Sequence, residues 1–177
     1  MAILKVAQLG HPVLRRVARD LSPEEIRSPE VKALVNDMRD TMVEYRGVGL
    51  AAPQVHHSVR IAVIEISSDN PRYDIQETVS AQVFFNARVT VLDETPYGFW
   101  EGCLSVHGLR GYVERPRRVR VDYLDADANP KSLEAEDFLA VVLQHELDHL
   151  DGVLYVDKLA DPKKLAFVEE YARYHVE

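Results

Sequence analysis

Two histidines four residues apart, His145 and His149, stand in the stretch QHELDHLDG with Glu146 beside the first. In a helix this spacing places both imidazoles on one face, where they can bind a metal ion while the glutamate serves as a base. Two histidines do not complete a hydrolytic site, because such sites usually have three protein ligands and an open position for water. The stretch therefore predicts metal-dependent hydrolysis if a third ligand exists, and hydrogen-bonded core histidines if none does.

Two residues are candidates for the third ligand. Glu169 follows His149 by twenty positions, a spacing that resembles thermolysin-like proteases, but it falls off the expected packing stripe of its helix. Cys103, the single cysteine, offers a soft thiolate suited to Zn(II) or Fe(II). A lone cysteine can also be a small buried hydrophobic residue. The presence of His145, Glu146 and His149 in the same chain favours Cys103 as the third metal ligand, and Glu169 remains the alternative.

Composition limits the classes of function. The 177 residues predict one domain spanning 1–177, and 46% hydrophobic with 28% charged residues is typical of globular proteins. The net charge of −8 argues against a broad nucleic-acid-binding face. No stretch approaches the roughly 18 apolar residues of a membrane span, and the first residues lack a signal-peptide run. We therefore expect a cytoplasmic protein without nucleic-acid or membrane partners.

The pattern of elements predicts an α+β fold with an antiparallel sheet. Ser28 can cap a helix over 28–47, in which an apolar stripe recurs at helical spacing. Residues 67–82 are polar and predict a loop. The expected strands are 59–66, 83–93 and 118–125, the last followed by a turn into a hairpin partner near 131–137. A final helix over 161–177 would pack through Leu165, Val168 and Ala172.

The helix that carries the two histidines is expected over 135–150. It is apolar almost all round, which is typical of a helix buried in the core. Phe138 and Val142 share one face with His145 and His149. The imidazoles are therefore expected to point into the interior beneath an apolar shelf.

Three stretches in order, GVGLAAPQ, EGCLS and QHELDHL, resemble the signature motifs of peptide deformylases. The resemblance runs over nearly the whole chain. It implies antiparallel β-sheets packed around a central metal-binding helix, with a C-terminal helix. It also implies a hydrolase that removes the formyl group from the N-terminal formylmethionine of new polypeptides and releases formate. One divalent metal ion is implied per chain, Fe(II) in the cell, with Zn, Ni or Co able to occupy the site.

The same resemblance assigns roles to residues. Cys103, His145 and His149 would bind the metal, and Glu146 would be the general base and acid. Gln54 and the backbone N–H of Leu104 would line the oxyanion site. The resemblance would also pair the backbone of Gly49 with the substrate, and Glu101 and Arg110 are expected to bind substrate as well. Phe138, Val141 and Val142 lie one to two turns before His145 on the expected helix, and with Val48 they would form an apolar slot for the methionine side chain; the alternative for these four residues is simple core packing.

The implied partners are N-formylmethionyl nascent peptides, which brings the enzyme near the ribosome. The expected last helix is short and not basic, which argues against direct docking there. Two rival functions are a thermolysin-like endopeptidase that uses Glu169 and a non-catalytic, metal-stabilised binding module.

Overall fold

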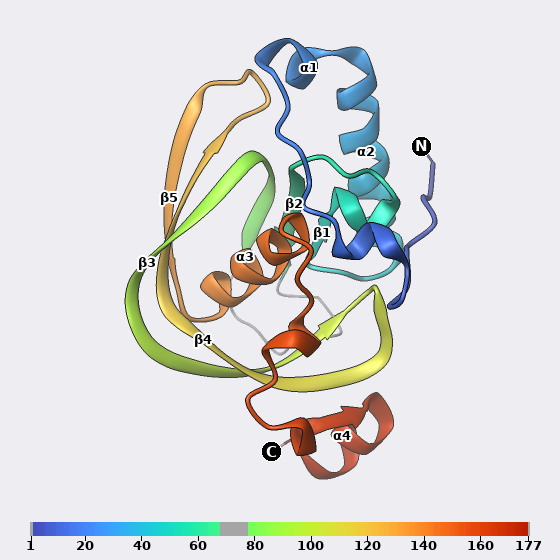
Figure 1. Ribbon diagram of the computed structural model, residues 1–177, viewed down its shortest axis with the longest axis vertical. Helices are drawn as coiled ribbons and strands as arrows, with labels where there is room; N and C mark the ends of the chain where they lie inside the picture. The colour runs from blue at the N-terminus through green and yellow to red at the C-terminus, as the bar shows by residue number, and fades with distance from the viewer. Residues whose placement is uncertain (1, 68–77, 177) are drawn as a thin grey trace.

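One antiparallel sheet curves around helix α3 in the computed structural model, which describes residues 2–67 and 78–176 (Figure 1). Its strands follow the order β1-β2-β3-β4-β5, and β6 pairs separately with β4. The strands are β1 (Gly49–Ala51), β2 (Ile61–Ile66), β3 (Val79–Cys103), β4 (Val106–Leu124), β5 (Pro130–Glu136) and β6 (Leu165–Phe167). The helices are α1 (Pro23–Arg27), α2 (Pro29–Glu44), α3 (Asp137–Leu150) and α4 (Val168–Tyr174), with short 3-10 turns between elements. The expected α+β fold, with a sheet around the metal-binding helix and a helix at the C-terminus, is confirmed.

Strands β3 and β4 are much longer than the sequence pattern predicts. Residues 83–93 and 118–124 are in strands as expected, and the predicted strand 118–125 ends one residue early, but the ladder continues to the pair Cys103↔Val106. Register shifts around Asp93 bend the hairpin and interrupt the alternation of polar and apolar residues from which strands are recognised. At Gly98 a Cβ atom would overlap the Tyr112 hydroxyl, so a larger residue would require the Tyr112 ring to move. The extension carries Cys103 along the sheet to α3.

Helix α3 lies inside the curved sheet, as its composition predicts. Eleven of its 14 residues are buried. Its apolar side chains form one cluster with β2, β3 and β4 residues that include Ile64, Phe84 and Val119. The helix begins at Asp137, two residues later than expected, because β5 continues through Glu136. Burial on all sides gives the two histidines a rigid support.

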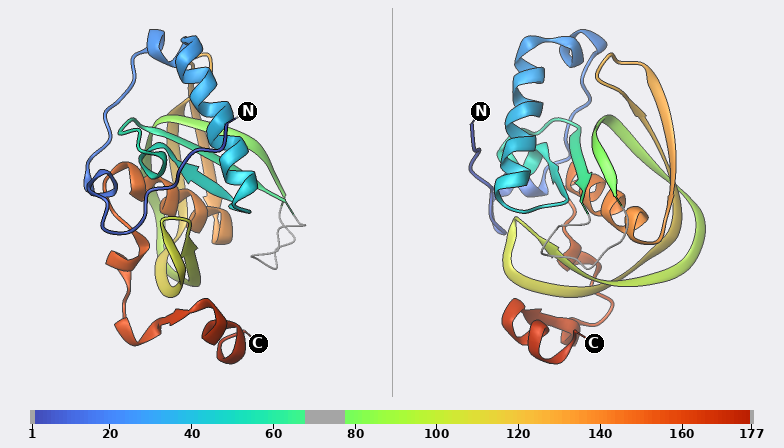
Figure 2. Two further views of the ribbon diagram at one scale, coloured as in Figure 1. Left: turned by 90° about the vertical axis from the view of Figure 1, so that its right-hand side faces the viewer. Right: turned by 180° about the vertical axis from the view of Figure 1, so that it is seen from behind.

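Helix α2 begins and packs as predicted. The Ser28 hydroxyl accepts a hydrogen bond from the Val31 N–H at 3.2 Å, and Pro29 occupies the first turn. Met38 and Met42 are fully buried against β2 residues such as Ile61. The helix covers the part of the sheet that contains β1 and β2 (Figures 1 and 2).

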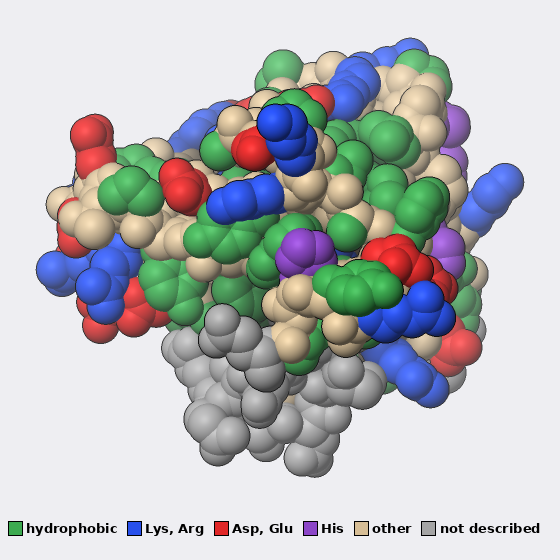
Figure 3. All heavy atoms as spheres, turned by 90° about the horizontal axis from the view of Figure 1, so that it is seen from below, with side chains coloured by type: hydrophobic (Ala, Val, Ile, Leu, Met, Phe, Trp, Pro, Cys, Tyr) green, Lys and Arg blue, Asp and Glu red, His purple; other side chains and the backbone are tan. Residues whose placement is uncertain are grey.

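The prediction of one helix over 161–177 is wrong. A 3-10 turn (Pro162–Lys164) leads into β6, and only Val168–Tyr174 are helical. Leu165 pairs with Gly111 of β4, and this backbone pairing overrides the helical pattern. Leu165, Val168 and Ala172 are exposed, so they form no packing stripe. The segment lies at the opposite end of the molecule from α1, on a face whose middle carries many hydrophobic side chains (Figures 2 and 3).

The loop prediction for 67–82 is wrong at its end, because Val79–Gln82 already belong to β3. Residues 68–77 of that prediction lie outside the described residues.

Among the helices that the structure describes, none is long and apolar enough to span a membrane.

Candidate metal centre

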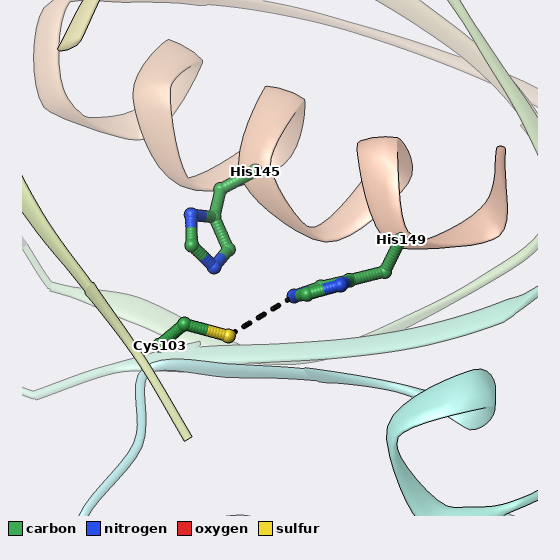
Figure 4. Close-up of side chains that lie close together, drawn as sticks. All are labelled: Cys103, His145 and His149. Carbon is green, nitrogen blue, oxygen red and sulfur yellow. Dashed lines mark hydrogen bonds between the residues drawn. The ribbon is translucent and has the colours of Figure 1, made fainter. Parts of the chain in front are cut away.

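Three possible metal ligands converge where the end of β3 meets α3. The donor atoms of Cys103, His145 and His149 all lie within 4.8 Å of one another, and all three residues are buried. The Cys103 sulfur is 3.3 Å from His149 Nε2, and the three side chains point toward a common centre (Figure 4). Glu169 is exposed on α4 and is not a member of this group. Within the described chain, the geometry therefore favours Cys103 over Glu169 as the third ligand.

The donor set fits a divalent cation of intermediate softness. One thiol and two imidazoles suit Zn(II) or Fe(II), and a three-residue set leaves a further coordination position open. Burial, the largest contribution, lowers the pKa of His149 and favours the neutral imidazole that a metal ligand must present. Burial alone would also lower the pKa of His145, but Cys103 and Glu101 outweigh it and raise that pKa well above its usual value. The carboxylate of Glu101 thus favours a positive charge at this point, which a metal ion bound to a neutral His145 would supply.

Glu101 holds the His145 ring in place. Its Oε2 lies 2.7 Å from His145 Nδ1, and its carboxylate also accepts hydrogen bonds from Arg115 at 2.5 and 3.0 Å. Burial alone would raise the pKa of Glu101, but the bonds to His145 and Arg115 lower it to about 2. An ionised carboxylate only accepts, so Nδ1 carries the proton and Nε2 is left as the metal-binding atom. Glu101, predicted to bind substrate, lines the cleft, and its carboxylate also contacts His145, a candidate metal ligand.

Arg115 was not among the site residues predicted from the sequence. Its side chain is only 2% exposed and lies beside Glu101, although fourteen positions separate the two residues. Nothing in the stretch around it distinguishes it from the exposed arginines that follow. Only the pairing of β3 with β4 shows that it points into the core.

A cleft of about 440 Å³ opens beside two of the three candidate ligands, Cys103 and His145. It is lined by most of the predicted site residues: Val48, Gly49, Gln54, Glu101, Cys103, Leu104, Phe138, Val141, Val142, His145 and Glu146. The additional residues are Gly47, Phe99 and Gly102. Arg110, expected to bind substrate, does not line it. Its side chain packs against Gly102, donates to the Trp100 carbonyl at 3.3 Å and lies over the Tyr171 ring.

Gly49 allows β1 to pass directly over Glu146. A Cβ atom at position 49 would lie 2.5 Å from both Cγ and Oε1 of Glu146, so a larger residue would displace that carboxylate. β1 is the terminal strand of the sheet and pairs with β2 through Gly49 and Ile64. Its other edge faces away from β2 and suits an added extended peptide.

Gln54 reaches the metal ligands from a 3-10 turn after β1. Its Oε1 accepts from the Ala51 N–H at 2.8 Å, which fixes the orientation of the amide. The Nε2 group is thereby placed 3.4 Å from the Cys103 sulfur and 3.3 Å from the Ser105 hydroxyl. The Ser105 N–H lies 3.4 Å from the same sulfur. Ser105, which the sequence reading missed, thus joins Gln54 in hydrogen bonding around the thiol.

We expect Glu101→Gln to weaken metal binding by roughly 10–100-fold, the usual effect of losing a carboxylate behind a histidine ligand. The amide weakens the acceptor for His145 and leaves Arg115 without a full counter-charge. Zinc affinity measured by chelator competition tests this. Glu134→Gln, which changes an exposed partner of Arg118, is the control. Equal affinities for the two variants would show that Glu101 does not support the ligand.

Comparison with known proteins gives consistent matches. The family model described as polypeptide deformylase matches residues 3–165. A peptide deformylase of Leptospira biflexa is 43% identical over 170 residues, covering 96% of this chain and 95% of the relative. One from Pseudomonas aeruginosa is 39% identical over 175 residues, covering 99% and 98%. A Met-Ala-Ser-bound class I type b enzyme of Acinetobacter baumannii aligns with TM-score 0.86 and 36% identity, covering 89% and 99%.

Proposed function

We propose that Cys103, His145 and His149 hold the metal ion of this chain, which belongs to the polypeptide deformylase family. The chain removes the formyl group from the N-terminal formylmethionine of new polypeptides. The convergence of these three donors, two of which line the cleft together with Glu146, carries the proposal. Glu146 contributes no atom to this donor group, and we assign its carboxylate to the activation of water. Residues 1–177 would form one catalytic domain.

The metal we propose is Fe(II), one ion per chain, with Zn, Ni or Co able to take its place. One sulfur and two nitrogen donors suit each of these ions, and the family resemblance favours iron. When bound, the ion supplies Lewis acidity that polarises the formyl carbonyl and lowers the pKa of water. Metal analysis of protein purified without oxygen identifies the native ion.

Glu146 would move the proton during hydrolysis. Its buried carboxylate, fixed beneath Gly49, takes a proton from the attacking water and returns it to the leaving amine. The C–N bond of the formamide breaks, and formate and a free amino terminus form. The Gln54 Nε2 group and the Leu104 N–H would face the negative charge that develops on the formyl oxygen.

The apolar part of the cleft would hold the methionine side chain. Val48, Phe138, Val141 and Val142 line it and are largely shielded from solvent. The edge of β1 at Gly49 would pair with the backbone of the substrate. Because these substrates leave the ribosome, the enzyme would act in the cytoplasm. α4 carries Glu169 and Glu170 against Arg173, which does not favour direct docking on ribosomal RNA.

We expect Val141→Phe to raise KM for formyl-Met peptides more than for formyl-Ala peptides. The larger ring occupies space beside the metal ligands that the methionine side chain requires. A hydrophobic pocket discriminates by about 1–3 kcal/mol per methylene-sized change, so an effect of roughly tens of fold is expected. Overpacking costs about 1–3 kcal/mol in stability, so melting temperature is measured too. Val43→Phe, at an exposed position, is the control. Equal losses on both peptides by a folded variant would place the pocket elsewhere.

Formate release from formyl-Met-Ala-Ser tests the function. The enzyme should release formate from this peptide and leave acetyl-Met-Ala-Ser intact. Cleavage of internal peptide bonds would support the endopeptidase instead. Metal binding without either reaction would support a non-catalytic binding module.

A further inference from the structure

The Arg115 guanidinium donates hydrogen bonds to two carboxylates, those of Glu101 and Asp148. Its Nε and Nη2 atoms donate to Glu101, and Nη1 donates to Asp148 at 2.7 Å. Asp148 belongs to α3, next to His149, and its side chain is 19% exposed. A continuous path of hydrogen bonds therefore runs from Asp148 through Arg115 and Glu101 to His145 Nδ1.

Asp148 also faces a second hollow, separate from the first cleft. This hollow of about 820 Å³ is lined by Gln144 and Asp148 of α3 and by Asp151, Lys158 and Arg60. The Lys158 ammonium lies 3.3 Å from Asp148. Gln144 and Asp148 of α3 are four residues apart and share a face, Asp151 follows directly after the helix, and His145 and His149 define a neighbouring face. Asp148 thus contacts both Lys158 at the hollow and the buried side chain of Arg115.

The planar shape of the Arg115 guanidinium links the position of Asp148 to that of Glu101. Its guanidinium is planar, so the direction of Nη1 toward Asp148 fixes the direction of the other two donors toward Glu101. Loss of Asp148 would leave a buried N–H without its acceptor, and the guanidinium would gain by rotating toward another one. Such a rotation would move the Glu101 carboxylate and with it the His145 ring.

We propose that Asp148 is a positioning residue, an inference that rests on the proposed metal site. Through Arg115 and Glu101, Asp148 holds His145 in the orientation that binds the metal. The hollow on the Asp148 side of α3 is thereby coupled to the metal centre. Asp148 touches neither substrate nor metal in this role. Its contribution is to keep Arg115, and through it Glu101, in one orientation.

The test compares zinc affinity, by chelator competition, among the wild type, Asp148→Asn and Asp151→Asn. Asp151 lines the same hollow but pairs with Arg60 at 2.5 Å instead of Arg115, so it is a matched control. We expect Asp148→Asn to bind zinc roughly tenfold more weakly, at the lower end of outer-shell effects. Asp151→Asn should stay within about twofold of the wild type, and Asp148→Glu should recover part of the loss. In the Co²⁺-loaded proteins, the visible absorption of Asp148→Asn should shift while that of Asp151→Asn should not.

Two results would overturn the positioning role. One is wild-type zinc affinity and an unshifted Co²⁺ spectrum in Asp148→Asn. The other is an equal loss in both asparagine variants, which would reflect the stability of α3 alone. If Asp148→Asn does not fold, Arg115→Lys gives the same test, because lysine keeps the charge but cannot fork between two carboxylates. A wild type that binds no zinc would remove the metal site itself, so the two proposals fail in different ways.

Discussion

Replacing Glu146 with alanine should leave the metal in place and slow deformylation by about 10²–10⁴-fold, the usual contribution of a positioned acid–base group. The expectation follows from geometry. Glu146 lies in the cleft with His145 and Cys103, yet the group of converging donor atoms is complete without it. Removing its carboxylate takes away the proton acceptor for water and keeps every proposed ligand.

Two measurements on Glu146→Ala check this prediction. Metal analysis should find about one ion per chain, and kcat/KM from formate release should fall. Glu44→Ala, which changes an exposed glutamate at the end of α2, should match the wild type in both. Loss of metal in Glu146→Ala would contradict the assignment and indicate a ligand or a folding role for this residue.

Replacing Cys103 with serine should remove the native metal chemistry, whereas Glu169→Ala should keep it. A serine hydroxyl is a much poorer ligand for Fe(II) or Zn(II) than a thiolate, so metal occupancy and activity should fall together. Glu169 is exposed on α4, outside the donor group, and its removal should change neither.

X-ray absorption on the loaded proteins distinguishes the two ligands. The wild type and Glu169→Ala should show a sulfur neighbour of the metal, and Cys103→Ser should not. If Glu169→Ala lost the metal while Cys103→Ser retained full activity, the site would have to be rebuilt around the glutamate.

The sequence by itself determined features that depend on neighbours along the chain. The Ser28 cap and Pro29 define the start of α2, and its apolar spacing defines the buried face. The all-round apolar composition of α3 predicts its burial, and the i, i+4 spacing predicts that His145 and His149 share a face. Hydrogen bonds within a helix span only four residues, so a short stretch contains the information that specifies them.

For the third ligand, the residues alone favoured Cys103 and left Glu169 as an alternative. The resemblance to a family assigned the role to Cys103. The structure supports that assignment because the β3–β4 ladder brings Cys103, 46 positions before His149, to within 3.3 Å of its ring. Register shifts in that ladder cannot be read from alternation, since each one reverses which side chains face the core.

Only the tertiary structure decided three further features. Arg115 looks like any surface arginine until strand pairing places it between Glu101 and Asp148. Gly49 looks like a turn residue until β1 is seen to cross Glu146. The segment Leu165–Phe167 has a helical pattern, yet its pairing with β4 makes it a strand. In each case the deciding contact joins residues far apart in sequence, and its free energy depends on the packing of the whole sheet around α3, which no local pattern encodes.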